Sequence, residues 1–319
     1  MKSTVAIVAF ALVWLSFDGF AQKIAFIADR SLWQANSAIF NGAKNTAAEL
    51  SKSGGKGIEI VYMPTPANES DKIRELGRAY LEGFSAAIIV ALEKSELLDA
   101  KISELSRSGF PSAVVGGGSL AGLVCVDTDS KKFAAALKEF VAKASQKAEI
   151  FCYFKGGKER EFDVSDSSEL ARKLGWRIGP DAFKDAFSGR KLSAFECGFY
   201  SEYAAKNSVE ILRRDNYCEV FFNPSLLSDL RPIKPDGDRE FIICVGALPI
   251  MEYYLQTSQI DCCISDDFYG WGVYSLRALV EELSKPASER AKFYKSLPPI
   301  ITTKENSAGF STDWRNWLK

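Results

Sequence analysis

The chain has 319 residues, of which 47% are hydrophobic and 25% are charged, and its 40 basic residues nearly balance its 41 acidic ones. This is ordinary globular composition, which excludes a disordered or fibrous chain, and the near-zero net charge argues against a general nucleic-acid binder. The chain contains no histidine, so every nucleophile, general base or zinc site that depends on imidazole is excluded.

The first 21 residues have the pattern of an export signal. Lys2 precedes an apolar run over residues 5–17, and the small residues Gly19 and Ala21 follow at the spacing of a cleavage site. This pattern is typical of a secretory leader. A membrane anchor would need about 20 apolar residues, and this run is shorter. We therefore expect residues 1–21 to be a cleaved signal peptide and the mature chain to be exported.

From residue 23 onward, short apolar strands alternate with amphipathic helices. Strands are predicted at 23–28, 57–63, 86–91, 111–117 and 123–126, and helices at 37–51, 70–83 and 95–108. The alternation then restarts, with helices at 130–145, 165–174, 201–214 and 249–256 and strands at 149–154, 191–197, 218–223, 240–246 and 261–265. A helix at 272–284 and a strand at 299–303 follow this second half. Apolar strands separated by helices predict an α/β fold of two doubly wound lobes with parallel sheets.

Seven cysteines are present, and export would favour paired ones. However, Cys125, Cys152 and Cys244 lie inside short strand-like runs, so small buried side chains are the preferred interpretation and disulfides the alternative. None of the spacings resembles a zinc or iron–sulfur site. The glycine-rich residues 114–122 lack the Gly-Lys-Ser/Thr ending of a nucleotide loop. The sequence predicts no metal and no cofactor.

Four segments together resemble one known family. They are KIAFIADRSLWQANSAIFNGAKNTAAEL (23–50), SAAIIVALEKSELLDAKISELSRSGFPSAVVGG (85–117), VCVDTDSKKFAAAL (124–137) and ISDDFYGWGVYSLRALVEEL (264–283). In order and spacing they are similar to the first strand with its ligand loop, the third and fourth strands, the first crossing and the late helix of the type 1 periplasmic sugar-binding proteins. That family contains the ribose- and galactose-binding proteins. The resemblance covers nearly all of residues 23–319.

The resemblance implies a chain that crosses three times between two lobes, near Val126, Asp266 and Pro298. The N-terminal lobe would comprise residues 22–126 and 267–297, and the C-terminal lobe residues 127–266 and 298–319. Three crossing segments would form a hinge, and a solute would bind in the cleft at the carboxyl ends of the strands. The family also implies a periplasmic monomer whose partner is an inner-membrane ABC permease or a receptor.

The resemblance also implies a set of ligand-binding residues. A sugar site needs flat aromatic faces and paired polar groups, and Trp33 is expected to be such a stacking face; the alternative is an aromatic that packs on the helix after it. Phe199 falls where the family places an aromatic wall, with a core role as the alternative. The full set is Asp29, Arg30, Trp33, Asn36, Gly117, Phe199, Asn223, Leu248, Asp267 and Tyr269.

Several positions depart from the family pattern. Glycines 116–118 replace an Asp-Arg pair, Leu248 stands near a missing aspartate, and Asp266 and Asp267 replace a glutamine and its neighbour. Lys158 and Arg160 either mimic a family arginine or belong to a solvated loop, as charge runs usually do. Trp271 is a further candidate for the pocket wall. A site with fewer carboxylates predicts a solute less polar or larger than a free hexose, such as a nucleoside, a modified sugar or a signalling furanone.

Three functions follow from these patterns. The leading one is a binding protein that captures a small solute, a sugar or a related compound, and delivers it to a permease or receptor without catalysis. The second is a degenerate family member that acts through protein contacts, because the clamp residues are missing. The third is an exported enzyme that uses carboxylates such as Asp266 and Asp267, although adjacent residues of a strand point to opposite faces. No nucleic-acid partner is expected.

Overall fold

A computed structural model describes residues 22–30, 33–54, 57–66, 68–175, 177–207, 216–227, 233 and 240–318. The predicted leader therefore lies outside the described residues. The chain forms two compact units. Unit 1 contains the segment that ends at Val126 and the segment Phe268–Lys295, and unit 2 contains Asp127–Asp267 and Ser296–Lys319, so the chain passes between them three times. In the part that the structure describes, no helix is long and apolar enough to span a membrane.

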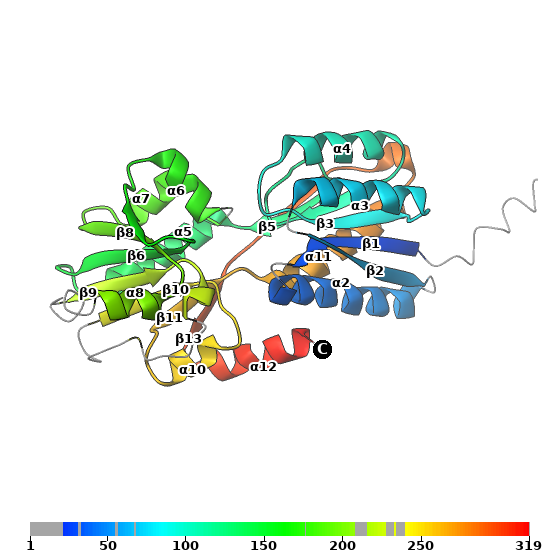
Figure 1. Ribbon diagram of the computed structural model, residues 1–319. Helices are drawn as coiled ribbons and strands as arrows, with labels where there is room; N and C mark the ends of the chain where they lie inside the picture. The colour runs from blue at the N-terminus through cyan, green and yellow to red at the C-terminus, as the bar shows by residue number, and fades with distance from the viewer. Residues whose placement is uncertain are drawn as a thin grey trace, which may run out of the picture. The chain divides into compact units, whose positions relative to one another are not determined.

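Unit 1 is built on a sheet with the strand order β12-β5-β4-β3-β1-β2. The strands are β1 (Gln22–Asp29), β2 (Ile58–Thr65), β3 (Ala86–Val90), β4 (Ser112–Val115), β5 (Val124–Thr128) and β12 (Phe293–Leu297). β2, β1, β3, β4 and β5 pair in parallel. In Figure 1, α3 (Glu69–Leu81) and α4 (Glu96–Arg107) cover one face, and α2 (Trp33–Gly54) and α11 (Phe268–Leu283) cover the other.

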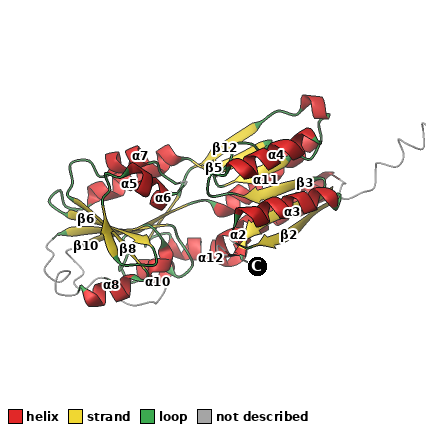
Figure 2. Ribbon diagram, turned by 45° about the horizontal axis from the view of Figure 1, so that its top comes forward, coloured by secondary structure: helices red, strands yellow, loops and turns green. Residues whose placement is uncertain are grey.

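Unit 2 has a sheet with the order β13-β11-β10-β9-β6-β8-β7. Its strands are β6 (Glu149–Lys155), β7 (Arg160–Phe162), β8 (Leu192–Cys197), β9 (Tyr217–Phe221), β10 (Glu240–Val245), β11 (Cys262–Ser265) and β13 (Ile300–Thr303). Its helices are α5 (Ser130–Lys143), α6 (Ser167–Leu174), α7 (Pro180–Ala186), α8 (Tyr200–Lys206), α10 (Met251–Gln256) and α12 (Ser307–Trp317). Figure 2 shows these helices in red around the yellow strands. The outermost pairs, β7–β8 and β11–β13, are antiparallel.

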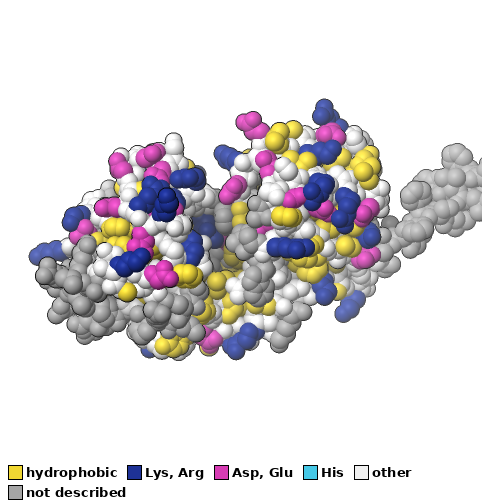
Figure 3. Space-filling model, viewed as in Figure 1, with side chains coloured by type: hydrophobic (Ala, Val, Ile, Leu, Met, Phe, Trp, Pro, Cys, Tyr) yellow, Lys and Arg dark blue, Asp and Glu magenta, His cyan; other side chains and the backbone are white. Residues whose placement is uncertain are grey.

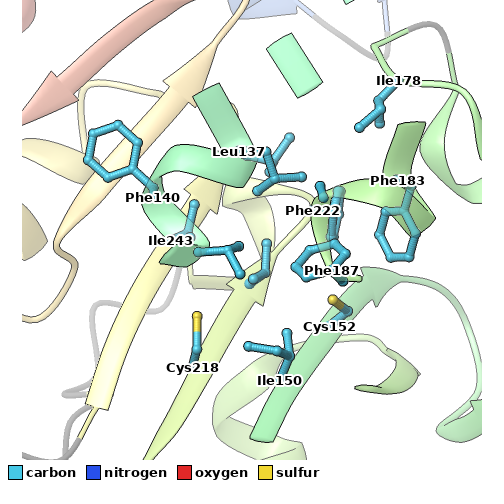
Figure 4. Close-up of a cluster of buried hydrophobic side chains, with 14 of the residues drawn as sticks. Leu137, Phe140, Ile150, Cys152, Ile178, Phe183, Phe187, Cys218, Phe222 and Ile243 are labelled. Atoms are coloured by element: carbon cyan, nitrogen blue, oxygen red, sulfur yellow. The ribbon is translucent and has the colours of Figure 1, made fainter. Parts of the chain in front are cut away.

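One face of the unit 2 sheet packs against α5, α6 and α7. Leu137 and Phe140 of α5 are buried above Ile150 and Cys152 of β6, and Phe183 of α7 joins the same cluster (Figure 4). These apolar side chains sit at the spacing that turns one helical stripe or one strand face toward the sheet. Burial of such side chains is the main favourable term in folding.

The opposite face of this sheet carries a buried carboxylate. Glu219 of β9 is 0% exposed and accepts hydrogen bonds from the hydroxyls of Tyr153 and Tyr200, each at 2.9 Å. Burial raises the pKa of Tyr200 well above its usual value, and the charge of Glu219 raises it further. Tyr200 therefore stays protonated and remains a donor to the carboxylate, which satisfies a polar group that would otherwise be costly to bury.

The parallel sheets and the two doubly wound units confirm the predicted α/β fold. The differences are short or peripheral elements that the sequence pattern did not predict: β7, α7, β12 and α12. β7 and β12 lie at sheet edges and α7 has 7 residues, so these three show no long hydrophobic period. α12 is different, because its buried Phe310 and Trp314 stand at helical spacing and could have indicated a helix. Of the helix predicted at 201–214, the structure describes α8 (Tyr200–Lys206), and the remainder falls mostly outside the described residues.

All seven cysteines are buried and free, which confirms the preferred interpretation of them as small core side chains. Burial raises the pKa of Cys197 to about 11 and that of Cys218 to about 12 because a thiolate loses its hydration there. Burial also raises the pKa of Cys152. Since the thiolate is the reactive form, these thiols are inert in the folded chain.

We expect Ellman's reagent at pH 8 to label none of the seven thiols of the folded protein quickly and all seven after denaturation without reductant. Ser53→Cys adds a thiol at an exposed position of α2 and should react at once, which shows that the reagent is active. Rapid native labelling of the parent protein, or fewer than seven thiols after denaturation, would contradict this assignment.

Candidate functional site

Both sheets have a point where the strand order reverses. In unit 1 the reversal lies between β1 and β3, and in unit 2 between β6 and β9. Loops that leave neighbouring parallel strands in opposite directions open a crevice at their carboxyl ends, and ligands of doubly wound proteins bind there. The loops at issue begin at Asp29 and Ala91 in unit 1, and at Lys155 and Phe222 in unit 2.

Asp29 ends β1 as a neutralised acid. Its side chain is 10% exposed, and a carboxylate oxygen lies 3.3 Å from Nζ of Lys72 in the first turn of α3. Arg30, the next residue, is exposed and forms no ion pair with a described carboxylate. The sequence did not predict Lys72, because it follows Asp29 by more than forty positions and meets it only through the β1–β2 pairing that places α3 above the strand end.

Asn36 in the first turn of α2 is 1% exposed, and its side-chain amide donates to the backbone carbonyl of Asp29. Its position holds the loop after β1 against the helix. Trp33 is the first residue of α2, and its side chain lies outside the described part of the structure. Asn36 therefore shapes this edge of unit 1 through the backbone of Asp29.

Tyr62 of β2 is a neighbour that the sequence did not predict. Its ring packs on Phe26 and Phe40, with centroids 5.7 and 5.4 Å away, and the side chain is 38% exposed. Partial burial raises the pKa of Tyr62, the charge of Asp29 raises it further, and Arg30 opposes both effects. Both charged residues at the end of β1 therefore influence the pKa of Tyr62, which lies opposite Phe26 and is partly exposed.

The glycines after β4 pack closely on the loop after β3. Gly116 and Gly117 have φ values of +100° and +75°, which favour glycine. A Cβ on Gly118 would lie 2.5 Å from the carbonyl oxygen of Ala91, to which the Gly118 amide donates at 2.8 Å. This turn therefore needs glycine for its own packing, and Gly117, half-buried within it, offers backbone groups only.

The first turn of α11 contains two aromatic residues that differ in burial. Tyr269 is half-buried, and its hydroxyl accepts a hydrogen bond from Asn45 of α2 at 3.2 Å. Asp267, the residue before α11, is also half-buried. Trp271 is 0% exposed and packs edge-to-face on Phe268, with centroids 5.2 Å apart. The expectation that Trp271 lines a pocket is wrong, because its helical position turns it into the core of unit 1.

Asp266 is a buried ion-pair partner within unit 2. Its side chain is 0% exposed, and one carboxylate oxygen lies 2.7 Å from Nε of Arg177. The other accepts the hydroxyl of Thr128 at 2.7 Å. Both oxygens are occupied, so Asp266 is poorly suited to be an acid or base in catalysis. The contact instead ties β11 to the end of β5, where two of the crossing segments meet.

The edge of unit 2 carries the other predicted residues. Phe199, the N-cap of α8, is 38% exposed, and Nζ of Lys155 lies 4.0 Å above its ring. Phe199 is therefore a surface aromatic, and the core alternative is wrong. Asn223 accepts the backbone amide of Ser225 at 2.9 Å, which makes a local turn after β9. Leu248 is half-buried in the loop after β10.

The charged loop after β6 is mostly engaged with its own unit. Arg160 pairs with Glu169 and Glu196, and Lys173 lies 2.7 Å from Glu196. Burial alone would raise the pKa of Glu196, but the contacts with Lys173 and Arg160 together outweigh it and lower that pKa. Lys158 is exposed. These contacts favour the solvated-loop interpretation of Arg160 over a ligand-binding role, because its guanidinium already forms ion pairs with two carboxylates. Figure 3 shows both signs of charge on the visible face of each unit.

Comparison with proteins of known structure identifies the fold of this chain. The sequence matches no family model and no curated protein. A ribose ABC transporter protein of Conexibacter woesei superposes with a TM-score of 0.69 at 11% identity, covering 95% of this chain and 99% of that one. The chain has the fold of the type 1 periplasmic binding proteins.

Two further structures of this fold are similar to the chain. A glucose-galactose binding protein from Geobacillus stearothermophilus gives a TM-score of 0.63 at 15% identity, with 90% of this chain and 99% of that chain covered. A Caulobacter myo-inositol binding protein gives 0.66 at 17% identity, with 91% and 96% covered. Coverage near the full length of each neighbour means that both units and all three crossings belong to the shared fold. This confirms the resemblance seen in the sequence at the level of the fold.

Proposed function

We propose that the chain is an exported solute-binding protein that captures a small sugar or sugar-like compound and delivers it to an ABC permease or a receptor. Support comes from the full-length likeness to a ribose ABC transporter protein and to sugar- and inositol-binding proteins. In doubly wound sheets the strand-order reversals mark where a ligand binds, and both units carry one. Of the residues predicted from the family, Asp29 and Arg30 lie at the end of β1 and Asn223 follows β9.

The observation that carries this proposal is the pair of polar and aromatic groups at the two reversals. Asp29 and Arg30 stand at the end of β1 in unit 1. In unit 2, Lys155 ends β6, and its ammonium group lies over the ring of Phe199 from the loop after β8. An aromatic face beside a small number of polar groups is the composition of a sugar site. The engaged oxygens of Asp266 favour binding over a carboxylate-dependent reaction.

A thermal-shift panel tests the proposal on the mature chain from Gln22. The panel contains pentoses, hexoses, inositol, nucleosides and sugar acids. A true ligand at about one hundred times its Kd should add about 2.7 kcal/mol to the free energy of unfolding. The absence of any shift with a folded protein would favour the second candidate, a degenerate member that acts through protein contacts.

A matched pair of variants makes the panel specific. Phe199→Ala should weaken the binding of the ligand about fivefold, because an aromatic face contributes on the order of 1 kcal/mol. Tyr253→Ala removes an aromatic side chain of α10 that is 47% exposed and should leave the affinity unchanged. Equal affinities for both variants would remove Phe199 from the site.

A further inference from the structure

We infer that Glu219 and Tyr200 are positioning residues, which hold the aromatic side chain of Phe199 in place for the solute. The inference rests on the proposed function, in which Phe199 contacts the solute, and it adds the groups that fix this contact. All three residues belong to unit 2. Phe199 and Tyr200 are neighbours in the chain, with Cα atoms about 3.8 Å apart. Whatever fixes the backbone of Tyr200 therefore also restricts that of Phe199.

The start of α8 is not fixed by a side-chain cap. Phe199 is the N-cap residue, and its side chain makes no capping hydrogen bond, whereas Ser, Thr, Asp or Asn would accept one there. α8 has 7 residues, and a helix this short depends on tertiary contacts. The hydrogen bond from the amide of Tyr203 to the carbonyl of Phe199 is long, at 3.3 Å. The position of Phe199 therefore depends on what holds the residue after it.

The side chain of Tyr200 is anchored in the interior of unit 2. It is 3% exposed, and its ring packs edge-to-face on Tyr153 and Phe221, with centroids 5.0 and 4.8 Å away. Its hydroxyl lies 2.9 and 3.0 Å from the two carboxylate oxygens of Glu219. A hydrogen bond to a charged acceptor is stronger than one between neutral groups. Glu219 itself is fixed, because β9 pairs in parallel with β6 on one side and with β10 on the other.

The ring of Phe199 is also held from outside α8. Nζ of Lys155 lies 4.0 Å from the centre of this ring and donates to the carbonyl of Gly198, the residue before it. The Phe199 side chain is nevertheless 38% exposed, so part of it is open to a solute. An aromatic contact depends on the geometry of the ring, and a side chain that is ordered before binding loses less entropy on binding. A fixed backbone at Phe199 therefore favours the contact.

Fluorine NMR tests the positioning without a ligand. The probe is para-fluorophenylalanine in place of Phe199 in the mature chain, for which we expect one narrow resonance. Tyr200→Phe removes the hydroxyl that Glu219 accepts and keeps the ring, so the resonance should shift and broaden. Tyr153→Phe is the matched control, because it removes the other tyrosine hydroxyl that Glu219 accepts, but from β6 and not from α8.

The control variant should leave the fluorine resonance close to its position in the parent protein. The two variants should lower the thermal midpoint to a similar extent, because each removes one tyrosine hydrogen bond from the same carboxylate. A difference between their spectra would then not reflect a difference in stability. An unchanged resonance in Tyr200→Phe, or equal shifts in both variants, would overturn the positioning role.

The affinity for the solute that the thermal-shift panel identifies tests the functional consequence. Tyr200→Phe should weaken binding about threefold, which is part of the loss expected for Phe199→Ala, and Tyr153→Phe should leave it nearly unchanged. In the Phe199→Ala background, Tyr200→Phe should weaken binding no further, since its effect acts through the missing ring. A further loss of the same size in that background would mean that Tyr200 acts independently of Phe199, and would overturn the inference.

The inference and the proposed function fail in different ways. If a solute binds but Tyr200→Phe neither moves the resonance nor weakens binding, the positioning role is wrong and the solute-binding function stands. If the thermal-shift panel is silent, the solute-binding function is overturned, and the fluorine resonance still decides whether Glu219 and Tyr200 hold Phe199 in place.

Discussion

Gly272→Ala should destabilise unit 1 by about 3 kcal/mol, at the upper end of the usual cost of overpacking. A Cβ at Gly272 of α11 would lie 1.9 Å from the carbonyl oxygen of Ile39 and 2.8 Å from the amide nitrogen of Ala43, both in α2. These are backbone atoms, so no side-chain rotation relieves the clash and the two helices must separate. Gly42 meets the same contact from α2, at 2.3 Å from the carbonyl oxygen of Tyr269.

Urea denaturation followed by circular dichroism measures this loss. Gly77→Ala is the matched control, because Gly77 lies inside α3 and its Cβ would meet only the end of the Lys101 side chain at 3.9 Å. There alanine should stabilise the chain by up to about 1 kcal/mol through its helix propensity. If Gly272→Ala is as stable as the parent, α2 and α11 do not pack as closely as described.

Asp266→Ala should cost about 3 kcal/mol of stability, because it breaks a buried ion pair and leaves one partner behind. The carboxylate of Asp266 is 0% exposed and its partner Arg177 is 17% exposed. The Thr128 hydroxyl loses its acceptor as well. The same substitution at Asp185, which pairs with Lys138 at the surface, should cost less than about 1 kcal/mol.

A double-mutant cycle separates the ion pair from the packing. Arg177→Met removes the other charge of the pair, so the double variant should be more stable than the sum of the two single losses predicts. Additive losses would mean that Arg177 and Asp266 do not stabilise each other.

The sequence predicted the strands and helices that have a strong hydrophobic period. β3 is a run of five buried apolar residues, and α4 follows the capping residue Ser95, whose side chain accepts the amide of Leu98. Such signals are local, since each element reports its own buried face. The sequence also predicted that the chain alternates between strand and helix throughout, which fixes the fold class.

The partners of the charged site residues could not be predicted. Lys72 reaches Asp29 and Arg177 reaches Asp266 through tertiary contacts, which no local pattern records. The exposure of the aromatic residues could not be predicted either, since Phe199 lies at the surface and Trp271 in the core. A helix shows which residues share a stripe, but not whether that stripe meets a sheet or solvent. The contacts and the burial of side chains near a candidate site can therefore be determined only from the structure.

Native mass spectrometry of the mature chain, mixed with the panel of sugars and sugar acids, tests the central claim most directly. We predict one small molecule bound per chain, lost or weakened in the Phe199→Ala variant and released on denaturation. A folded chain that retains no molecule at any concentration of the panel would contradict a solute-binding function.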